Sequence, residues 1–184
     1  MERPNWKTIA AALAALALAL APRGLPAQDV GIPLGSVPEA VQIEDLDGQP
    51  VDLGQYIGKT PVFIEFWAAW CEVCQALQPR VEAAYQRFGQ QAKFLTIAVA
   101  VNQTPRSVQR HLTRHPIPGR VLWDTNGRAV RAFQAPATSY VVVLDRHGRV
   151  AYTGIGEDQD LIAAIAKALD SQDGPRPPSA AGRR

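Results

Sequence analysis

The stretch that decides the fold of this chain is Phe66-Trp67-Ala68-Ala69-Trp70-Cys71-Glu72-Val73-Cys74. It completes a nearly continuous apolar run, Pro61 to Trp67, which predicts a strand buried on both faces. Beyond Cys71, apolar residues recur at three- and four-residue spacing as far as Phe88, and this spacing predicts a helix that Gly89 ends. The two cysteines therefore stand in the first turn of a helix that follows a buried strand.

Two cysteines separated by two residues at the start of a helix can form a disulfide reversibly. Cys71 comes first, at the helix N-terminus, where free backbone N–H groups and the helix dipole stabilise a thiolate. Cys74 lies one turn inside the helix, where it is shielded and can attack a mixed disulfide formed at Cys71. The pattern indicates thiol–disulfide exchange.

Two other interpretations of the cysteine pair stay open. A purely structural disulfide over so short a span would close almost no loop and would stabilise the fold little. A metal site would need further ligands, and the candidates are His111 and His115, which we expect to lie on a solvated helix face. Because the chain has only two cysteines, a disulfide-scaffolded mini-protein and a four-cysteine zinc or iron–sulfur site are both excluded.

The first 27 residues are typical of an export signal. Arg3 and Lys7 precede an uncharged run of 13 residues, Ile9 to Ala21, which is shorter than the roughly 20 residues that span a bilayer as a helix. We predict a signal peptide over residues 1–27, with cleavage before Gln28. An uncleaved N-terminal membrane anchor and a buried helix rich in alanine and leucine are the alternatives.

The rest of the chain is predicted to be one domain with a short tail. A length of 184 residues, with 47% apolar and 20% charged residues, is typical of one globular domain. Residues 28–172 carry the alternating pattern of that domain, whereas residues 173–184 lack apolar periodicity and are predicted to be disordered. The formal charge of +2 comes from the first 27 residues, which hold three basic residues and one acidic residue. Without them the chain is neutral, so composition gives no support for nucleic-acid binding.

Strand and helix signals alternate through the domain, which indicates an α/β fold with a mixed central sheet flanked by helices. The expected strands other than the central one are a hairpin over residues 41–53 and strands over 93–101, 121–123, 138–144 and 150–152. The expected helices after the first cover residues 104–115, 127–133 and 158–169.

The strand, the motif Phe-Trp-Ala-x-Trp-Cys-x-x-Cys and the helix together resemble the signature of thioredoxin-like oxidoreductases. The exported setting, the N-terminal hairpin and an extra β–α unit around residues 102–133 are similar to the TlpA/ResA/DsbE branch, over about residues 33–170. The resemblance implies a thioredoxin-like fold with an N-terminal β-hairpin extension and a central β–α insertion. It also implies no cofactor other than the redox-active disulfide Cys71–Cys74, and no metal.

Further site residues follow from the same resemblance. Pro136 stands at the place of the family's cis-proline, whose loop binds the substrate chain as an added strand; an ordinary trans turn proline is the alternative. Ala135, before it, is expected to contact the substrate. The same is expected of Trp70, Glu72 and Val73, which surround the reactive cysteine, while Trp67 packs beneath.

Glu65 is the unusual residue of the central strand, because its neighbours are apolar. It stands six residues before Cys71, where thioredoxin carries a buried aspartate. Burial should raise the pKa of its carboxyl group and make it a candidate proton donor and acceptor for Cys74. The alternative is a glutamate at a strand edge that reaches solvent. Glu72 should disfavour the Cys71 thiolate, which favours a reductant over an oxidant.

These observations predict an exported enzyme that reduces protein disulfides in the cell envelope, as a monomer. The resemblance suggests a membrane thiol transporter as electron donor and apocytochrome c among the substrates. Rival interpretations are a thiol oxidase or isomerase on the same fold, and a copper-handling chaperone that uses the cysteines and a distal histidine such as His147. Arg106, Arg110 and Arg114 share one helix face, which is either solvated surface or a docking face for an acidic partner.

Overall fold

The computed structural model describes residues 30–171, so the predicted signal segment and the predicted tail lie outside the described residues. The strands are β1 (Gln42–Asp45), β2 (Pro50–Asp52), β3 (Val62–Trp67), β4 (Lys93–Val99), β5 (Arg120–Asp124), β6 (Tyr140–Leu144) and β7 (Val150–Gly154). The helices are α2 (Glu72–Phe88), α3 (Pro105–Arg114), α4 (Arg128–Ala132) and α5 (Leu161–Asp170), with a 3-10 turn η1 (Leu53–Gln55).

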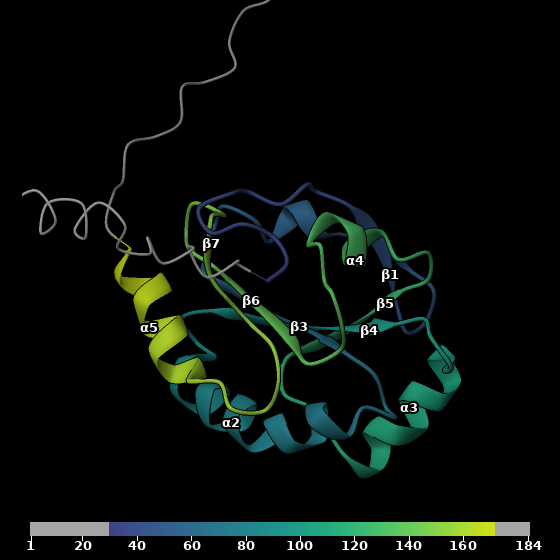
Figure 1. Cartoon of the computed structure of the whole chain (residues 1–184). Coiled ribbons are helices and arrows are strands. Elements are labelled where there is room, and N and C mark those ends of the chain that lie inside the picture. Colours follow the sequence, from purple (N-terminus) through teal and green to yellow (C-terminus); the bar gives the residue numbers. More distant parts are fainter. Residues whose placement is uncertain (1–29, 172–184) are drawn as a thin grey trace, which may run out of the picture.

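All seven strands form one mixed sheet in the order β2-β1-β5-β4-β3-β6-β7. β3 pairs in parallel with β4 and antiparallel with β6, and all six of its residues are buried, as its continuous apolar run predicts. In Figure 1, α2, α3 and α5 lie below the sheet and α4 lies above it. The mixed sheet flanked by helices is therefore confirmed.

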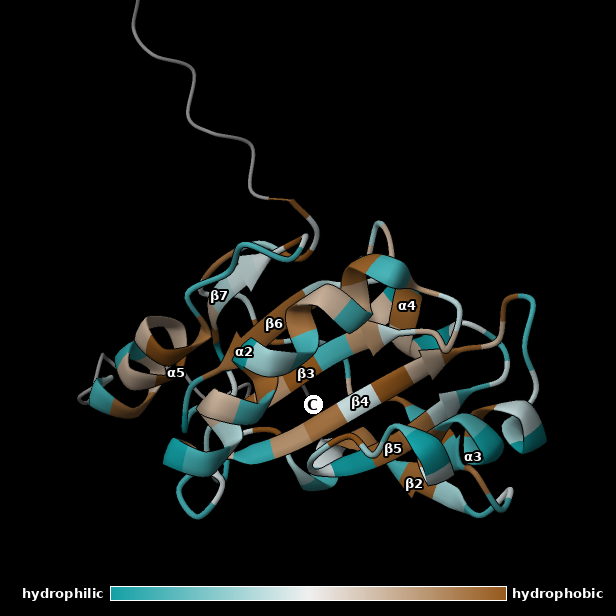
Figure 2. Ribbon diagram, turned by 90° about the horizontal axis from the view of Figure 1, so that it is seen from below, coloured by the Kyte–Doolittle hydropathy of each residue, from teal (hydrophilic) through white to brown (hydrophobic). Residues whose placement is uncertain are grey.

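The buried core consists of two clusters. Ile64 and Phe66 of β3 join one of them, together with Trp67 and the cysteine pair, and Phe63 joins the cluster formed with α2 and α5. Figure 2 shows the apolar character of the central strands. This packing holds the carboxyl end of β3, and with it the cysteine loop, in a defined place.

The predicted N-terminal hairpin is present as β1 and β2. Ile43 pairs with Val51, and β1 adds to the sheet by antiparallel pairing with β5. Asp45 stabilises the turn between them, because its carboxylate accepts the N–H groups of Asp47 and Gln49 at 3.0 and 2.9 Å. The hairpin extends the sheet at the end away from β7.

Helix α3 begins as the sequence predicts, at a threonine followed by a proline. Thr104 and Ser107 form a reciprocal capping box, with distances of 3.2 and 2.9 Å between backbone nitrogen and side-chain oxygen. Two other elements start later than expected: β6 begins at Tyr140 and α5 at Leu161, after its cap Asp160. Among the described residues, no helix is both long enough and apolar enough to cross a membrane.

Candidate active site

The two cysteines are joined by a disulfide at the start of α2, with their Cα atoms 5.2 Å apart. Cys71 is the N-cap of the helix, and its sulfur accepts the backbone N–H of Cys74 at 3.1 Å. Cys71 retains 5% of its surface and Cys74 none. The pair therefore has the arrangement expected from the spacing, with one cysteine at the helix terminus and the other shielded one turn inside.

This geometry favours a thiolate at Cys71 when the disulfide is reduced. The first turn of a helix has backbone N–H groups without carbonyl partners, and the Cys74 N–H already points at the Cys71 sulfur. An N–H group that donates to a sulfur stabilises negative charge there, and the positive end of the helix dipole adds to this effect. Glu72, the first residue of α2, is exposed and acts in the opposite sense.

The two tryptophans of the motif have different environments. Trp67 is 2% exposed and lies beneath the cysteine loop, as expected, with the edge of its ring system against His111 at a centroid distance of 5.3 Å. Trp70 is 47% exposed, and its indole Nε1 donates to the carbonyl oxygen of Val101 at 2.7 Å. This hydrogen bond holds an apolar ring at the surface beside Cys71.

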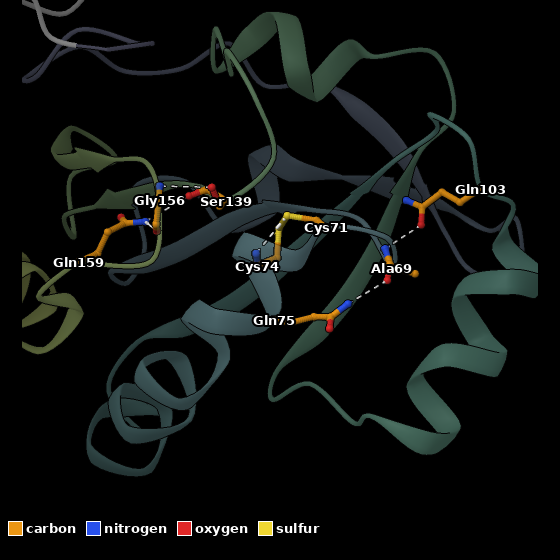
Figure 3. The surroundings of a disulfide bond; sticks show 8 residues. All are labelled: Ala69, Cys71, Cys74, Gln75, Gln103, Ser139, Gly156 and Gln159. Atoms are coloured by element: carbon orange, nitrogen blue, oxygen red, sulfur yellow. Dashed lines mark hydrogen bonds between the residues drawn. A yellow bond between two sulfur atoms is a disulfide. The ribbon is translucent and has the colours of Figure 1, made fainter.

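Glutamine side chains hold the cysteine loop in place, and sequence reasoning missed them. The Ala69 N–H donates to Oε1 of Gln103 at 3.0 Å (Figure 3). Nε2 of Gln103 in turn donates to the carbonyl of Val99 at 2.7 Å. On the other side, Nε2 of Gln75 donates to the Ala69 carbonyl at 3.4 Å. Gln103 follows β4 at the carboxyl end of a parallel pair, and that position is the signal that could have identified it.

Replacing Gln103 by alanine should lower the free energy of unfolding by about 1–3 kcal/mol, because the partly buried Ala69 N–H loses its acceptor. Urea denaturation of the oxidised protein measures this change. The matched control is Gln86→Ala on the exposed face of α2, where a change within about 0.5 kcal/mol is expected. Equal losses in the two variants would show that the Gln103 hydrogen bonds do not stabilise the loop.

Glu65 is fully buried in β3, so the alternative of a solvent-reaching glutamate is wrong. Desolvation by burial raises the pKa of its carboxyl group from 4.5 to about 8, as the sequence predicts in direction. Neither carboxyl oxygen has a hydrogen-bond partner among the described residues. At neutral pH the carboxyl group is therefore mainly protonated, with a minor ionised fraction.

The segment before β6 differs from expectation. No peptide bond in residues 30–171 is cis, so the prediction of a cis-proline at Pro136 is wrong. Pro136 is exposed, and Ala135 is partly buried with its N–H on the carbonyl of Val130 at 2.9 Å. The physical reason is register: Ser139, not Pro136, directly precedes β6, and its N–H donates to the Phe66 carbonyl at 2.8 Å. A proline has no N–H with which to form this bond.

Ser139 is buried and has the left-handed backbone conformation, with φ of 62°. Gln159 holds it there, since its Nε2 donates to the Ser139 carbonyl at 3.1 Å and to the Gly156 carbonyl at 2.6 Å. The Ser139 hydroxyl accepts the Gly156 N–H at 3.2 Å (Figure 3). This cluster ties the start of β6 to the segment after β7, and no local pattern in the sequence indicates it.

The sequence predicts that His111 and His115 lie together on a solvated helix face, and this prediction is wrong for His111. His115 is exposed, but His111 is partly buried against Trp67, and the two imidazole rings lie 4.8 Å apart. In the part of the chain that the structure describes, no three histidine, cysteine or acidic side chains are grouped so that they could hold a metal ion. His147 lies in the turn before β7, and its N–H donates to Asp145 Oδ1 at 2.8 Å.

The fold and this site define a class: thioredoxin-like proteins with a disulfide at the start of the helix that follows the central strand. A family model described as Redoxin matches residues 33–169, and the chain belongs to that family. This family membership, together with similar curated proteins and solved structures, confirms the thioredoxin-like fold and the resemblance to ResA and DsbE proteins.

Curated relatives of the chain are described as thiol–disulfide oxidoreductase ResA. The protein of Halalkalibacterium halodurans is 27% identical over 108 residues, which are 59% of this chain and 60% of that protein. The protein of Geobacillus thermodenitrificans is 24% identical over 67% of this chain and 70% of its own length. The chain thus spans somewhat less than two thirds of the length of the first of these relatives.

Among solved structures, a putative thiol:disulfide interchange protein DsbE from Chlorobium tepidum is similar, with a TM-score of 0.65. It is 20% identical to this chain, and the match covers 75% of this chain and 99% of that one. At 20% identity, this similarity supports the fold alone.

Proposed function

We propose that this protein is an exported thiol–disulfide oxidoreductase that reduces disulfides of cell-envelope proteins. The observation that carries the proposal is the disulfide at the N-terminus of α2, with Cys71 partly accessible and Cys74 fully buried. Of the two cysteines, only Cys71 has exposed surface that an incoming protein can reach. The ResA relatives and the export signature in residues 1–27 support the same function.

The first step is attack by the reduced enzyme. The Cys71 thiolate, which accepts the Cys74 N–H, attacks one sulfur of a substrate disulfide. The substrate S–S bond breaks, one substrate sulfur leaves as a thiolate, and a mixed disulfide links the other to Cys71. The leaving thiolate takes a proton from water, and no cofactor takes part.

In the second step, Cys74 resolves the mixed disulfide. Its thiol loses a proton, and the resulting thiolate attacks the Cys71 sulfur, which releases the second substrate sulfur and leaves the disulfide Cys71–Cys74. Two electrons have then passed to the substrate. Glu65 is the proposed acceptor of this proton: with a pKa of about 8, close to that of a thiol, a minor fraction of the group is ionised at neutral pH, and that carboxylate can take the proton from Cys74.

Exposed apolar side chains around the disulfide support docking of a protein substrate. Trp70, Val73, Val101 and Ile155 are each between 41% and 54% exposed. All four belong to segments at the sheet end where β3 and β7 finish, which is the end that carries the cysteines. We propose that Trp70, Val73 and the exposed Glu72 contact the substrate, together with Ala135 and Pro136 before β6.

We propose that the enzyme reduces its substrates. The Glu72 carboxylate beside Cys71 disfavours the Cys71 thiolate, and this makes the reduced form of the enzyme less stable and therefore a stronger reductant. We expect a reduction potential nearer to about −270 mV than to about −120 mV, the span of thioredoxin-fold enzymes. A value near the upper limit would favour the oxidase or isomerase alternative. A membrane thiol transporter as electron donor, apocytochrome c as substrate and a monomeric state are part of the proposal.

The experiment that tests the proposed function is trapping with Cys74→Ser. Without Cys74 the mixed disulfide at Cys71 cannot be resolved, so we expect substrate proteins linked to Cys71 on non-reducing gels of cells that express the variant. Cys71→Ser/Cys74→Ser is the control and should trap nothing. If the single variant traps nothing while the wild-type pair stays oxidised in cells, the disulfide is structural and the proposal is wrong.

A further inference from the structure

A hollow of about 310 Å³ lies between α2 and α3, next to the cysteine loop. Trp67 lines it, and Gln75 and Gln78 of α2 face His111 and Arg114 of α3 across it. Gln75 connects the hollow to the active site, because its Nε2 donates to the carbonyl of Ala69, two residues before Cys71. A group bound here would lie on the α3 side of the disulfide.

One residue that lines the hollow, Gln78, carries a hydrogen-bond donor without an acceptor. Nε2 of Gln78 is buried and has no hydrogen-bond partner in the described part of the chain. A buried donor without an acceptor costs free energy, which a ligand oxygen in the hollow would remove if the partly buried Gln78 side chain turns its amide toward it. Arg114 is exposed and forms no ion pair with a described residue, so its guanidinium group is available as well.

Arg114 places a positive charge on the α3 side of the hollow. The pKa of His111 is lowered, first by burial and then by the nearby charges of His115 and Arg114. On the α2 side Glu82 contributes the one carboxylate that lines the hollow. Positive charge together with a buried amide donor suits a carboxylate ligand.

We propose that this hollow binds a carboxylate group of the substrate protein, supplied by an acidic side chain close to the cysteine that reacts with Cys71. The inference rests on the proposed function. Gln78 stands about 10 Å along α2 from Cys71, because each helical residue advances about 1.5 Å. An extended chain covers that distance in about three residues, so the acidic side chain would lie about three positions from the substrate cysteine.

The test uses two synthetic peptides, each with one disulfide, that differ only in Glu or Gln three residues from a cysteine. Wild-type protein should reduce the Glu peptide with a kcat/KM about threefold to tenfold higher, as expected for one charge-assisted contact.

Matched variants separate the hollow from the general charge of α3. Arg114→Gln should abolish the preference for the Glu peptide, whereas Arg106→Gln, which removes the same charge outside the hollow, should keep it. Glu82→Gln should increase the preference, because it removes a like charge. Equal loss in both arginine variants would overturn the proposal, since the effect would then come from the whole helix.

Free carboxylic acids are the other source of the same chemistry, and succinate is the probe. If succinate shifts the NMR signals of His111 and His115 while the peptides are reduced at equal rates, the assignment to the substrate is overturned. Equal rates without any succinate effect overturn the carboxylate site altogether. If neither peptide is reduced, the proposed function fails instead, which distinguishes the two failures.

Discussion

Replacing Cys71 by serine should abolish the reduction of protein disulfides, with a loss of rate on the order of a thousandfold or more. A serine hydroxyl is not ionised at neutral pH, so the nucleophile at the N-terminus of α2 disappears. Cys74 cannot replace it, because Cys74 is fully buried. Reduction of insulin with dithiothreitol as electron donor, followed by turbidity at pH 7, measures the loss.

Cys74→Ser is the matched control for this substitution. It also removes the disulfide, but it leaves the Cys71 thiolate at the helix terminus, so a single attack on a substrate disulfide should proceed and turnover should stop. Rapid mixing with a chromogenic disulfide separates these two outcomes. If Cys71→Ser retained the fast single attack that Cys74→Ser shows, Cys71 would not be the attacking residue.

Replacing Glu65 by leucine should stabilise the folded protein, by an amount that grows between pH 5 and pH 8. The pKa of the Glu65 carboxyl group is about 8 in the folded protein, whereas its ordinary value is 4.5. At pH values between 4.5 and 8, Glu65 is ionised in the unfolded chain but keeps its proton in the folded protein. The contribution of Glu65 to stability is therefore fully present below pH 4.5 and falls by about 1.4 kcal/mol per pH unit above it.

At pH 7 the leucine variant should be more stable by about 3 kcal/mol, and its stability should lack the Glu65 slope with pH. Urea unfolding of the oxidised proteins at pH 5, 7 and 8 measures both quantities. Glu39→Leu removes an exposed carboxylate and should leave the slope unchanged. A wild-type protein whose stability did not fall from pH 5 to pH 8 would contradict the burial of a neutral Glu65.

The same variant tests the proposed proton transfer. Without the Glu65 carboxyl group, resolution of the mixed disulfide by Cys74 should slow, whereas the first attack by Cys71 should not. The mixed disulfide should then accumulate in single-turnover experiments and decay more slowly below pH 8. Equal decay in both proteins would remove Glu65 from the mechanism and leave it a buried acid without a role in exchange.

Much of the candidate site could be predicted because its signals are local. The spacing of Cys71 and Cys74 and the helical pattern that follows decide the N-terminal placement of the pair. The burial of Glu65 follows from apolar neighbours on both sides in a strand between two others. In each case the residues that produce the effect lie within one turn of helix or one strand.

The missed features depend on residues that are far apart in the chain. Gln103 reaches Ala69 across 34 positions, and Gln159 reaches Ser139 across 20. In the register of β6 on β3, Phe66 pairs with Tyr140 and its carbonyl accepts the N–H of Ser139. Pro136 therefore lies three residues before the position that the resemblance to the family motif assigned to it. His111 is partly buried because α3 packs on Trp67, which its helical spacing cannot show.

By itself, the sequence determined the α/β fold class, the central buried strand and the cysteine pair at the start of a helix. Hydrophobic periodicity and capping act over a few residues, so they can be recognised without the rest of the molecule. The tertiary structure alone decided which side chains hold the cysteine loop, which residue precedes β6, and that α2 and α3 enclose a hollow beside the disulfide. Those outcomes depend on strand register and helix packing, which result from the free energy of the whole core.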